Sequence, residues 1–394
     1  MHTHAAQIVR AFIRDQLNSI HAARRGLWCA AVMSVMSGQW LSLSRLARGI
    51  MGAGNLKAAL KRVDRLIGCA RIGSEAHFIG AALVRRLCSR TQPVVIAVDW
   101  SAVAPGGKFV ELRASLVHAG MGRGLTIYQR IYPGSKLCNA NCESALLRTL
   151  REWLPAGSPV IIVTDAGFRR PWFAEIERLD WMWVGRIRSG VHISRDNAHW
   201  QDARGWFAKA TGKAQRWCGC ALTRRYRFTC DMVLVRRAVR AGKRYGRIGH
   251  GPTPKARREA RASAREPWLL AHSPQLRGYR AEQIVAWYAR RMQIEENFRD
   301  HKSAEFGMGL QFSQSRSAQR LLALSLIGTV AAFLLWHIGQ LAEAEGVHRR
   351  FKVTTRKARE LSVITLALLL CDMRCLPLTD FAIHILYQRL GVRE

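Results

Sequence analysis

The feature that most constrains the fold is a pair of nearly identical apolar phrases, each opened by a proline and closed by an aspartate. The first is PVVIAVD, Pro93 to Asp99, and the second is PVIIVTD, Pro159 to Asp165. An uninterrupted run of aliphatic and β-branched residues of this length is typical of a strand buried on both faces. Such strands lie at the centre of a sheet that helices cover, so the two phrases predict an α/β fold.

The segments around these strands predict the rest of the sheet. Residues 108–118 and 125–133 suit an antiparallel meander, and residues 141–154 have helical spacing. A helix near 171–179 and a strand at 181–187 follow. The resulting order, β-β-β-α-β-α-β, is that of a ribonuclease-H-like core.

The charge of the chain is strongly unbalanced. Lys and Arg number 62 against 27 Asp and Glu, which leaves a net charge of +35. Because such an excess repels itself, a polyanion is the expected partner: nucleic acid first, an anionic membrane surface as the alternative. Eleven of the basic residues lie in residues 236–265, where we expect contact with a DNA backbone. A solvated charged loop is the alternative interpretation of that stretch.

Residues 41–68 have the pattern of a helix, a glycine turn and a second helix, as in DNA-reading units. The turn is Gly52-Ala53-Gly54, and Asn55 is the predicted N-cap of the second helix. An ordinary basic hairpin is the alternative, because this pattern is common by chance. The basic residues of the second helix that we expect to contact DNA are Lys57, Lys61, Arg62 and Arg65.

The sequence predicts a cytoplasmic protein. Charged residues interrupt the N-terminus before any stretch apolar enough for an export signal. The ten cysteines form no Cys-x-x-Cys pair, which predicts reduced thiols, with a zinc site as the alternative. Residues 321–341 approach the length of a membrane span, but their polar residues gather on one side, as in a helix packed in a soluble bundle.

Composition and element order together divide the chain into five predicted regions. Both ends are helical, and the core sheet is interrupted by short strand-like pieces. The predicted regions are a helical DNA-binding domain at 1–90, the first part of the core at 91–189, a β-rich insertion with the basic stretch at 190–275, the second part of the core at 276–310, and a helical C-terminal region at 311–394.

The two strand-ending aspartates are candidate metal ligands. Side chains at the C-terminal ends of neighbouring buried strands emerge at one rim of the sheet. Asp99 and Asp165 would therefore face each other, and two close carboxylates repel unless a cation such as Mg²⁺ joins them. Two aspartates that merely cap turns after their strands are the alternative.

A third carboxylate comes from the segment WYARRMQIEENFRDHK. On one continuous helix, Glu295 shares the apolar face of Tyr288, together with Arg291 and Lys302, whereas Asn297 and its polar neighbours face solvent. A carboxylate on an apolar face must be paired, neutral or bound to metal. We expect a functional cleft there, with a structural salt-bridge cluster as the alternative.

Tyr288, Arg291, Glu295 and Lys302 match the pattern Tyr-x2-Arg-x3-Glu-x6-Lys. In this pattern the chain resembles the DDE transposases of bacterial insertion sequences, in the insertion-sequence-four family. The phrases KRVDRLIG, VDWSA and TDAGFRRPWF also look like that family. The resemblance covers nearly the whole chain and is weakest beyond about residue 310.

The resemblance implies a catalytic and metal-binding triad of Asp99, Asp165 and Glu295 on the ribonuclease-H-like core. It implies two Mg²⁺ ions, for which Mn²⁺ substitutes, and cut-and-paste transposition through a hairpin at the transposon end. Arg291 and Lys302 would hold phosphates of the double-stranded DNA, and Tyr288 belongs to the same signature. A homodimer would join the two ends in the nucleoid, without a membrane. A nuclease that does not join DNA and an inactive end-binding relative are the alternatives.

Trp268 precedes the signature segment and follows the basic stretch. In related transposases a tryptophan in a similar place looks to stack on a base flipped out of the DNA. A tryptophan in the core of the insertion is the alternative.

Overall fold

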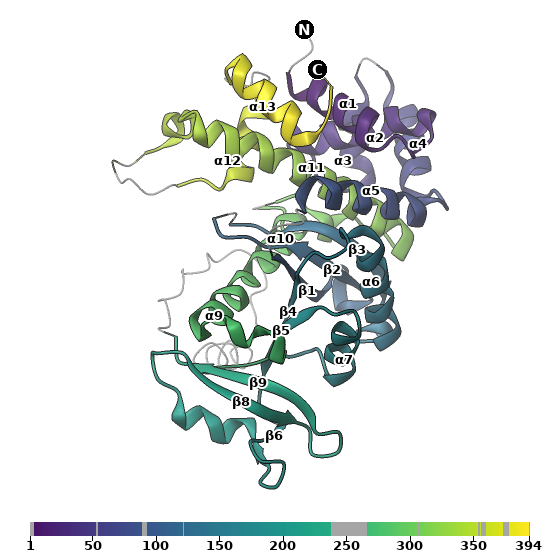
Figure 1. Cartoon of the computed structure of the whole chain (residues 1–394). Helices are drawn as coiled ribbons and strands as arrows, with labels where there is room; N and C mark the ends of the chain where they lie inside the picture. The colour runs from purple at the N-terminus through teal and green to yellow at the C-terminus, as the bar shows by residue number, and fades with distance from the viewer. Residues whose placement is uncertain are drawn as a thin grey trace. The chain divides into compact units, whose positions relative to one another are not determined.

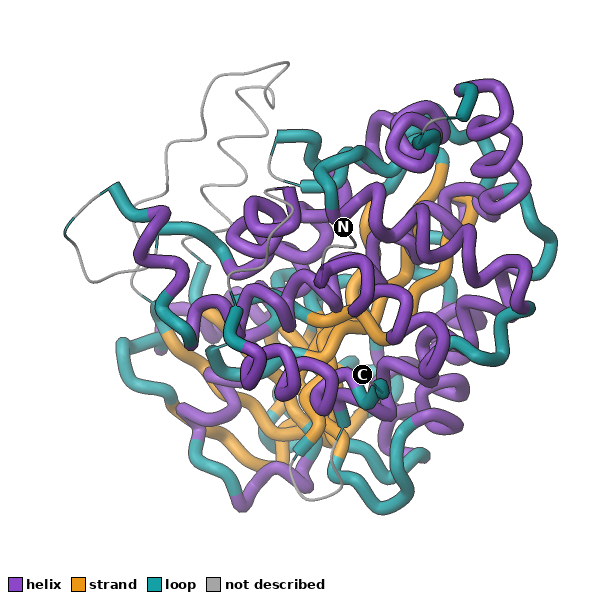
Figure 2. Tube along the Cα trace, turned by 90° about the horizontal axis from the view of Figure 1, so that it is seen from above, coloured by secondary structure: helices purple, strands orange, loops and turns teal. Residues whose placement is uncertain are grey.

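The structure is a computed structural model, and it describes residues 4–52, 54–88, 93–120, 122–237, 266–305, 307–353, 355, 360–372 and 378–393. The chain forms two compact units. One comprises Met1–Ser158 with Met292–Glu394, and the other is Pro159–Arg291. Figure 1 labels most of the elements, and Figure 2 shows helices in purple and strands in orange. The boundaries of the five predicted regions differ from those of the two units and stay a prediction.

Three antiparallel strands form the sheet of the first unit, in the order β3-β2-β1. They are β1 (Val94–Ala102), β2 (Phe109–Leu116) and β3 (Leu125–Pro133). This arrangement confirms the predicted meander. The pairing of β1 with β2 places Asp99 opposite Arg113. β1 continues to Ala102, beyond its predicted end at Asp99, because residues 100–102 go on pairing with β2.

The other elements of the first unit are helices. Their bounds are α1 (His4–Gln16), α2 (Ala22–Met36), α3 (Leu43–Ile50), α4 (Leu56–Ile67), α5 (Ile72–Leu87), α6 (Ala140–Trp153), α10 (Met292–Lys302), α11 (Ala318–Ala344), α12 (Val363–Asp372) and α13 (Asp380–Leu390). The two ends of the chain meet in this unit, since the Gln16 amide donates to the carbonyl of Gly391 at 2.6 Å.

Helix α11 is the central helix of the first unit. It packs against α2, α4, α5, α12, α13 and β3, and a helix that is apolar all round must be buried on every side. Among the described residues it is the one helix long and apolar enough to cross a membrane, and its most apolar window is wholly buried inside the protein. Burial within the unit therefore accounts for its composition.

The second unit contains a seven-strand order, β4-β5-β10-β9-β8-β6-β7. β4 and β5 are parallel, and the remaining neighbours are antiparallel. The bounds are β4 (Val160–Thr164), α7 (Arg170–Arg178), β5 (Met182–Ile187), β6 (His192–Ser194), β7 (Gln201–Asp202), β8 (Gln215–Leu222), β9 (Phe228–Val235), β10 (Trp268–His272) and α9 (Ala281–Arg290).

The strands expected in the β-rich insertion extend the sheet of this unit. β10 pairs with β5 on one side and with β9 on the other. Of the basic stretch, Arg236 and Arg237 are described, and the rest lies outside the described residues. The chain is thus a mixed α/β protein with flanking helices, as the sequence predicts.

Candidate active site

Two of the three predicted triad carboxylates line one pocket in the first unit. The pocket has a volume of about 450 Å³, and its walls include Asp99, Ser101, Glu295 and Lys302. Asp99 and Ser101 come from β1, whereas Glu295 and Lys302 come from α10. Residues nearly 200 positions apart in sequence therefore meet where β1 and α10 pack together, since the two elements are in contact.

The position of Asp99 follows from the burial pattern of β1. Val94 to Val98 are buried, and the strand emerges from the core at Asp99, which is half-buried. One carboxylate oxygen of Asp99 accepts the backbone N–H of Trp100 at 2.8 Å. The apolar run thus fixes the backbone, and the carboxylate lies at the point where the strand reaches the pocket.

Lys302 is tied to the same strand. Its Nζ donates to the Ser101 hydroxyl at 2.8 Å and to the Ala102 carbonyl at 3.3 Å. The ammonium also lies 5.5 Å from the centre of the Phe298 ring. Burial lowers the pKa of Lys302, although the carboxylates of Glu111 and Asp99 act in the opposite direction. A cation is therefore fixed beside Asp99.

The structure contradicts the predicted burial of Glu295. Glu295 is exposed, whereas Asn297 and Asp300, which were expected to face solvent, are buried. One reason is that the expected single helix is two helices, α9 ending at Arg290 and α10 beginning at Met292, so a helical wheel counted from Tyr288 does not carry over. The other is that the inner face of α10 is itself polar.

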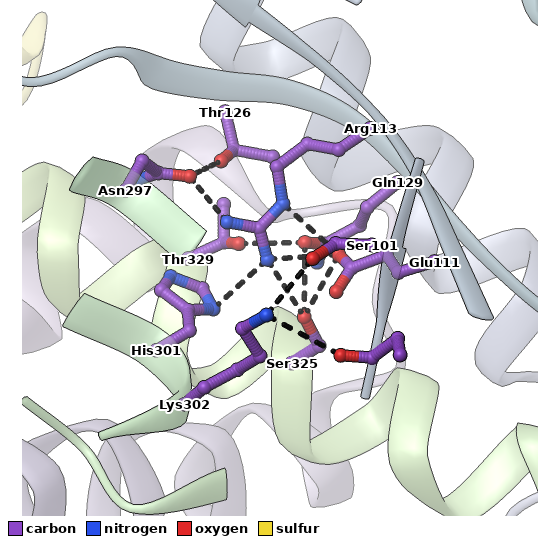
Figure 3. A network of polar contacts seen from close by, with 11 residues as sticks. Ser101, Glu111, Arg113, Thr126, Gln129, Asn297, His301, Lys302, Ser325 and Thr329 are labelled. Carbon is purple, nitrogen blue, oxygen red and sulfur yellow. Dashed lines mark hydrogen bonds and ion pairs between the residues drawn. The ribbon is translucent and has the colours of Figure 1, made fainter. Parts of the chain in front are cut away.

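The inner face of α10 contacts a buried polar network centred on Arg113, which is fully buried on β2 (Figure 3). The Arg113 guanidinium donates to Glu111 Oε1 at 2.8 Å and to the Asn297 side-chain oxygen. It also lies 3.1 Å from His301 Nδ1. Burial and the nearby Arg113 charge hold the pKa of His301 well below its usual value. A neutral His301 accepts a hydrogen bond from the Arg113 guanidinium. Polar contacts therefore hold α10 to β2.

The network continues onto α11. Ser325 donates to Glu111 Oε1 at 3.1 Å, and the Gln129 amide bonds with both Ser325 and Thr329. Thr126 of β3 donates to the Asn297 oxygen at 2.8 Å. Beside the network, Asp300 pairs with Arg123 at 2.5 Å, yet burial raises the pKa of Asp300 to about 6.

Asp165 lies in the second unit, directly after the buried strand β4. One of its carboxylate oxygens accepts the backbone N–H of Gly167 at 2.8 Å, which closes a turn before α7. The turn-capping alternative therefore describes one contact of Asp165. It does not exclude metal binding, because a carboxylate offers about four lone-pair directions.

Tyr288 and Trp268 pack together in the same unit. Tyr288 is 3% exposed, and the Trp268 ring meets it edge-on at 4.7 Å. The Arg291 guanidinium lies 5.8 Å from the Tyr288 ring, and that of Arg237 lies 4.4 Å from the Trp268 ring. Burial raises the pKa of the Tyr288 hydroxyl, and the Asp165 charge adds to the rise. Trp268 itself is only half-buried.

The donor set of the pocket fits a hard divalent cation in part. Within the described parts of the chain, no group of three or more His, Cys, Asp or Glu side chains is arranged to hold a metal ion. Asp99 and Glu295 nevertheless supply two carboxylates to one pocket. Mg²⁺ commonly binds one or two carboxylates and completes its shell with water and substrate phosphate.

Comparison with known proteins decides the family. The family model described as "Transposase DDE domain" matches residues 90–331, which is more than half of the chain. The chain belongs to this family. It is therefore an enzyme of the DDE transposase class, a class that acts on DNA as a nuclease or transesterase and generally uses divalent metal ions.

No curated protein matches this transposase. Among solved structures it is similar to a piggyBac transposase synaptic complex with hairpin DNA, determined by cryo-EM. The TM-score is 0.39 and the sequence identity 10%, over 99% of this chain and 75% of that chain. So distant a likeness says nothing about individual residues.

The N-terminal hairpin of the transposase has the predicted form. α3 and α4 pack against each other, and the Asn55 side chain caps α4 by accepting the Ala58 N–H at 2.8 Å. The four basic residues predicted to contact DNA, Lys57, Lys61, Arg62 and Arg65, are all exposed. The nine cysteines in the described part of the chain form no disulfide with one another.

Sequence reasoning missed the residues that position the transposase pocket, above all Arg113 and Ser101. Glu111 and Arg113 stand two apart on a predicted strand and therefore point to the same face. Two opposite charges on one face of a central strand are a signal of a buried ion pair. That signal was available, and it would also have suggested a polar partner on the helix that covers the sheet.

Proposed function

We propose that this transposase excises an insertion sequence by cut-and-paste transposition and joins its ends to target DNA. The observation that carries the proposal is that Asp99 and Glu295 line one pocket while Lys302 is bonded to the strand beside Asp99. The four-residue signature favours the insertion-sequence-four group of bacterial transposases. The parallel pair β4-β5 and the meander are compatible with a ribonuclease-H-like core.

In this proposal Asp99, Asp165 and Glu295 hold Mg²⁺, and Mn²⁺ substitutes for it. When bound, the metal activates water or a DNA 3′-hydroxyl and stabilises the leaving oxygen. Lys302 attracts the scissile phosphate as a point charge, and its bonds to Ser101 and Ala102 hold the ammonium in place. Arg291, which is the C-cap residue of α9 and is only 8% exposed, would offer its planar fork to a second phosphate.

The proposal includes a hairpin at the transposon end, with Trp268 stacking on the base that leaves the helix. Two observations support a role beyond packing. Trp268 is only half-buried, and the Arg237 guanidinium lies over its ring as a cation that also attracts phosphate. The edge-on contact with Tyr288 supports the core alternative equally.

The proposed partners are the two double-stranded ends of the element and the target DNA. The exposed basic residues of α4 are offered to one end, and a homodimer brings two ends together in the nucleoid. The net charge of +35 supports a polyanionic partner such as DNA.

The proposal is tested by the joining of cleaved ends to target DNA. Labelled duplexes that carry the terminal repeats flanking the gene are incubated with the full-length transposase, a target plasmid and Mg²⁺. Cut-and-paste transposition predicts both cleaved ends and end–target joints. Cleavage without joints would indicate the nuclease alternative, and binding without cleavage would indicate an inactive relative.

A further inference from the structure

Three cavities of the first unit adjoin one another and begin at the Asp99–Glu295 pocket. A second cavity, of about 320 Å³, shares Gln311 with that pocket. A third, of about 640 Å³, shares with the second the segment from Ser313 to Arg316. The segment between α10 and α11 thus contributes residues to all three cavities, from the carboxylates of the first to the α3 residues of the third, and the three together are called the groove.

Away from the carboxylates, the groove is lined by positively charged side chains. Lys108 lines the second cavity, and Arg316 lines both the second and the third. Arg320 faces the third cavity but is paired with Asp64 at 2.7 Å, so that pair adds little net charge. From 310 to 317 the segment has no acidic residue and carries hydroxyl and amide groups. Such a lining suits the phosphate backbone of a nucleic acid.

An aromatic platform stands in the third cavity. Phe312 is 48% exposed although it is a large apolar residue, and one side of its ring stacks on Trp40 at 5.7 Å with an angle of 29°. The Arg45 guanidinium lies 4.9 Å from the Trp40 ring. An exposed ring that is braced from behind and flanked by basic side chains is the arrangement on which single-stranded bases stack.

The Phe312 ring belongs to a segment whose backbone is held in place by hydrogen bonds. The Met308 carbonyl accepts the Leu41 N–H, and the Met308 N–H donates to the Asp300 carbonyl, both at 2.7 Å. Gly309 is in the left-handed region at φ 65°, and a Cβ there would lie 2.9 Å from the Trp40 ring. The segment is therefore held against both α10 and the Trp40 ring before any ligand binds.

We infer that this groove takes one unpaired DNA strand leaving the Asp99–Glu295 pocket, with Lys108 and Arg316 on its phosphates and one of its bases stacked on Phe312. The inference rests on the proposed function in one respect, namely that the strand in the pocket is DNA. A single strand is the occupant because a base inside a duplex has no free face for the Phe312 ring.

The test uses 2-aminopurine, a base whose fluorescence is quenched when it stacks. The probe is a duplex with a single-stranded tail that carries the label at successive tail positions, bound to the full-length protein without divalent metal. Quenching is expected at one tail position with the unaltered protein. Phe312→Ala should abolish it, and Phe312→Tyr should retain it. Phe381→Ala is the matched control, because Phe381 is 71% exposed and lines none of the three cavities.

The two basic residues have their own readout. The double variant Lys108→Ala, Arg316→Ala should have a shallower slope of log affinity for the tail against log salt concentration, by about 0.7 for each phosphate that is no longer neutralised. The control Arg350→Ala should leave the quenching position and its depth unchanged. Quenching that survives Phe312→Ala, that disappears equally in Phe381→Ala, or that depends on Trp268 instead would overturn the inference. Because no metal is present, a failure of cleavage cannot produce any of these results.

Discussion

Replacing Arg113 with Met removes the only cation that directly pairs with Glu111 among the described residues, inside a buried polar network. The side chains of both residues are 0% exposed, and their closest atoms are 2.8 Å apart. Removing one partner of a buried ion pair costs about 3–5 kcal/mol, because the other charge stays buried without compensation. Arg113→Met should therefore remove a large part of a typical domain stability of about 5–15 kcal/mol.

Thermal unfolding followed by circular dichroism measures this loss. At roughly 2–4 °C per kcal/mol for a unit of this size, the unfolding temperature should fall by about 6–20 °C. Arg148→Met, at an exposed position of α6, is the control and should change stability by no more than about 0.5 kcal/mol. Adding Glu111→Gln to Arg113→Met should recover part of the loss, since no buried charge then remains.

The same variant should affect catalysis below its unfolding temperature. Asn297 accepts from Arg113, and α10, which carries Asn297, also carries Glu295. A less firmly held α10 should raise the Mg²⁺ concentration needed for half-maximal cleavage, which a purely global loss of stability would not do in the folded protein. A fall in unfolding temperature of less than about 2 °C would refute the reasoning.

Three further predictions follow from particular residues. Neither ring nitrogen of His337 has a hydrogen-bond partner among the described residues, and burial lowers its pKa to about 3. The folded state disfavours the charged ring, so the free energy of unfolding should fall by about 1.4 kcal/mol for each pH unit below pH 6.5. His337→Leu should remove that loss in thermal unfolding between pH 4 and 7. Equal acid sensitivity of the variant and the unaltered protein would contradict this. Gly309→Ala should destabilise by about 1–3 kcal/mol in the same assay, whereas Gly278→Ala, where a Cβ meets nothing within 4 Å, should be nearly neutral. Trp268→Ala should permit the first nick on labelled end DNA but impair hairpin formation, with partial rescue by an abasic site at the flipped position; equal loss of both steps together with lower stability would support the core alternative.

Local patterns were sufficient to predict several elements of the fold. The apolar runs ending at Asp99 and Asp165 gave two buried strands, because a run of β-branched residues leaves few other conformations that bury it. Asn55 was predicted as an N-cap from the residues around it alone, and the structure confirms the cap. Each of these features depends on residues within a few positions in sequence.

The face that α10 buries could not be predicted from local sequence patterns. Asn297 is buried because Arg113, 184 positions away, needs an acceptor, and a hydropathy pattern assigns both residues to solvent. The break between α9 and α10 at Arg291 then shifts Glu295 off the face expected for it. Glu295 lines one pocket with Asp99, and its role in the triad stays a prediction, whereas its burial, which was argued from periodicity, was wrong.

The central claim is that Asp99, Asp165 and Glu295 act together on DNA. Single-turnover cleavage of a labelled transposon end with Mg²⁺, measured for Asp99→Asn, Asp165→Asn and Glu295→Gln at saturating protein, tests it most directly. Glu296→Gln, on the neighbouring position of α10, is the control. The account predicts a loss of at least roughly 10³-fold for each of the three variants, with end binding within a few fold of the unaltered protein and the control active. Cleavage within ten-fold of the unaltered protein in any one of the three would contradict it.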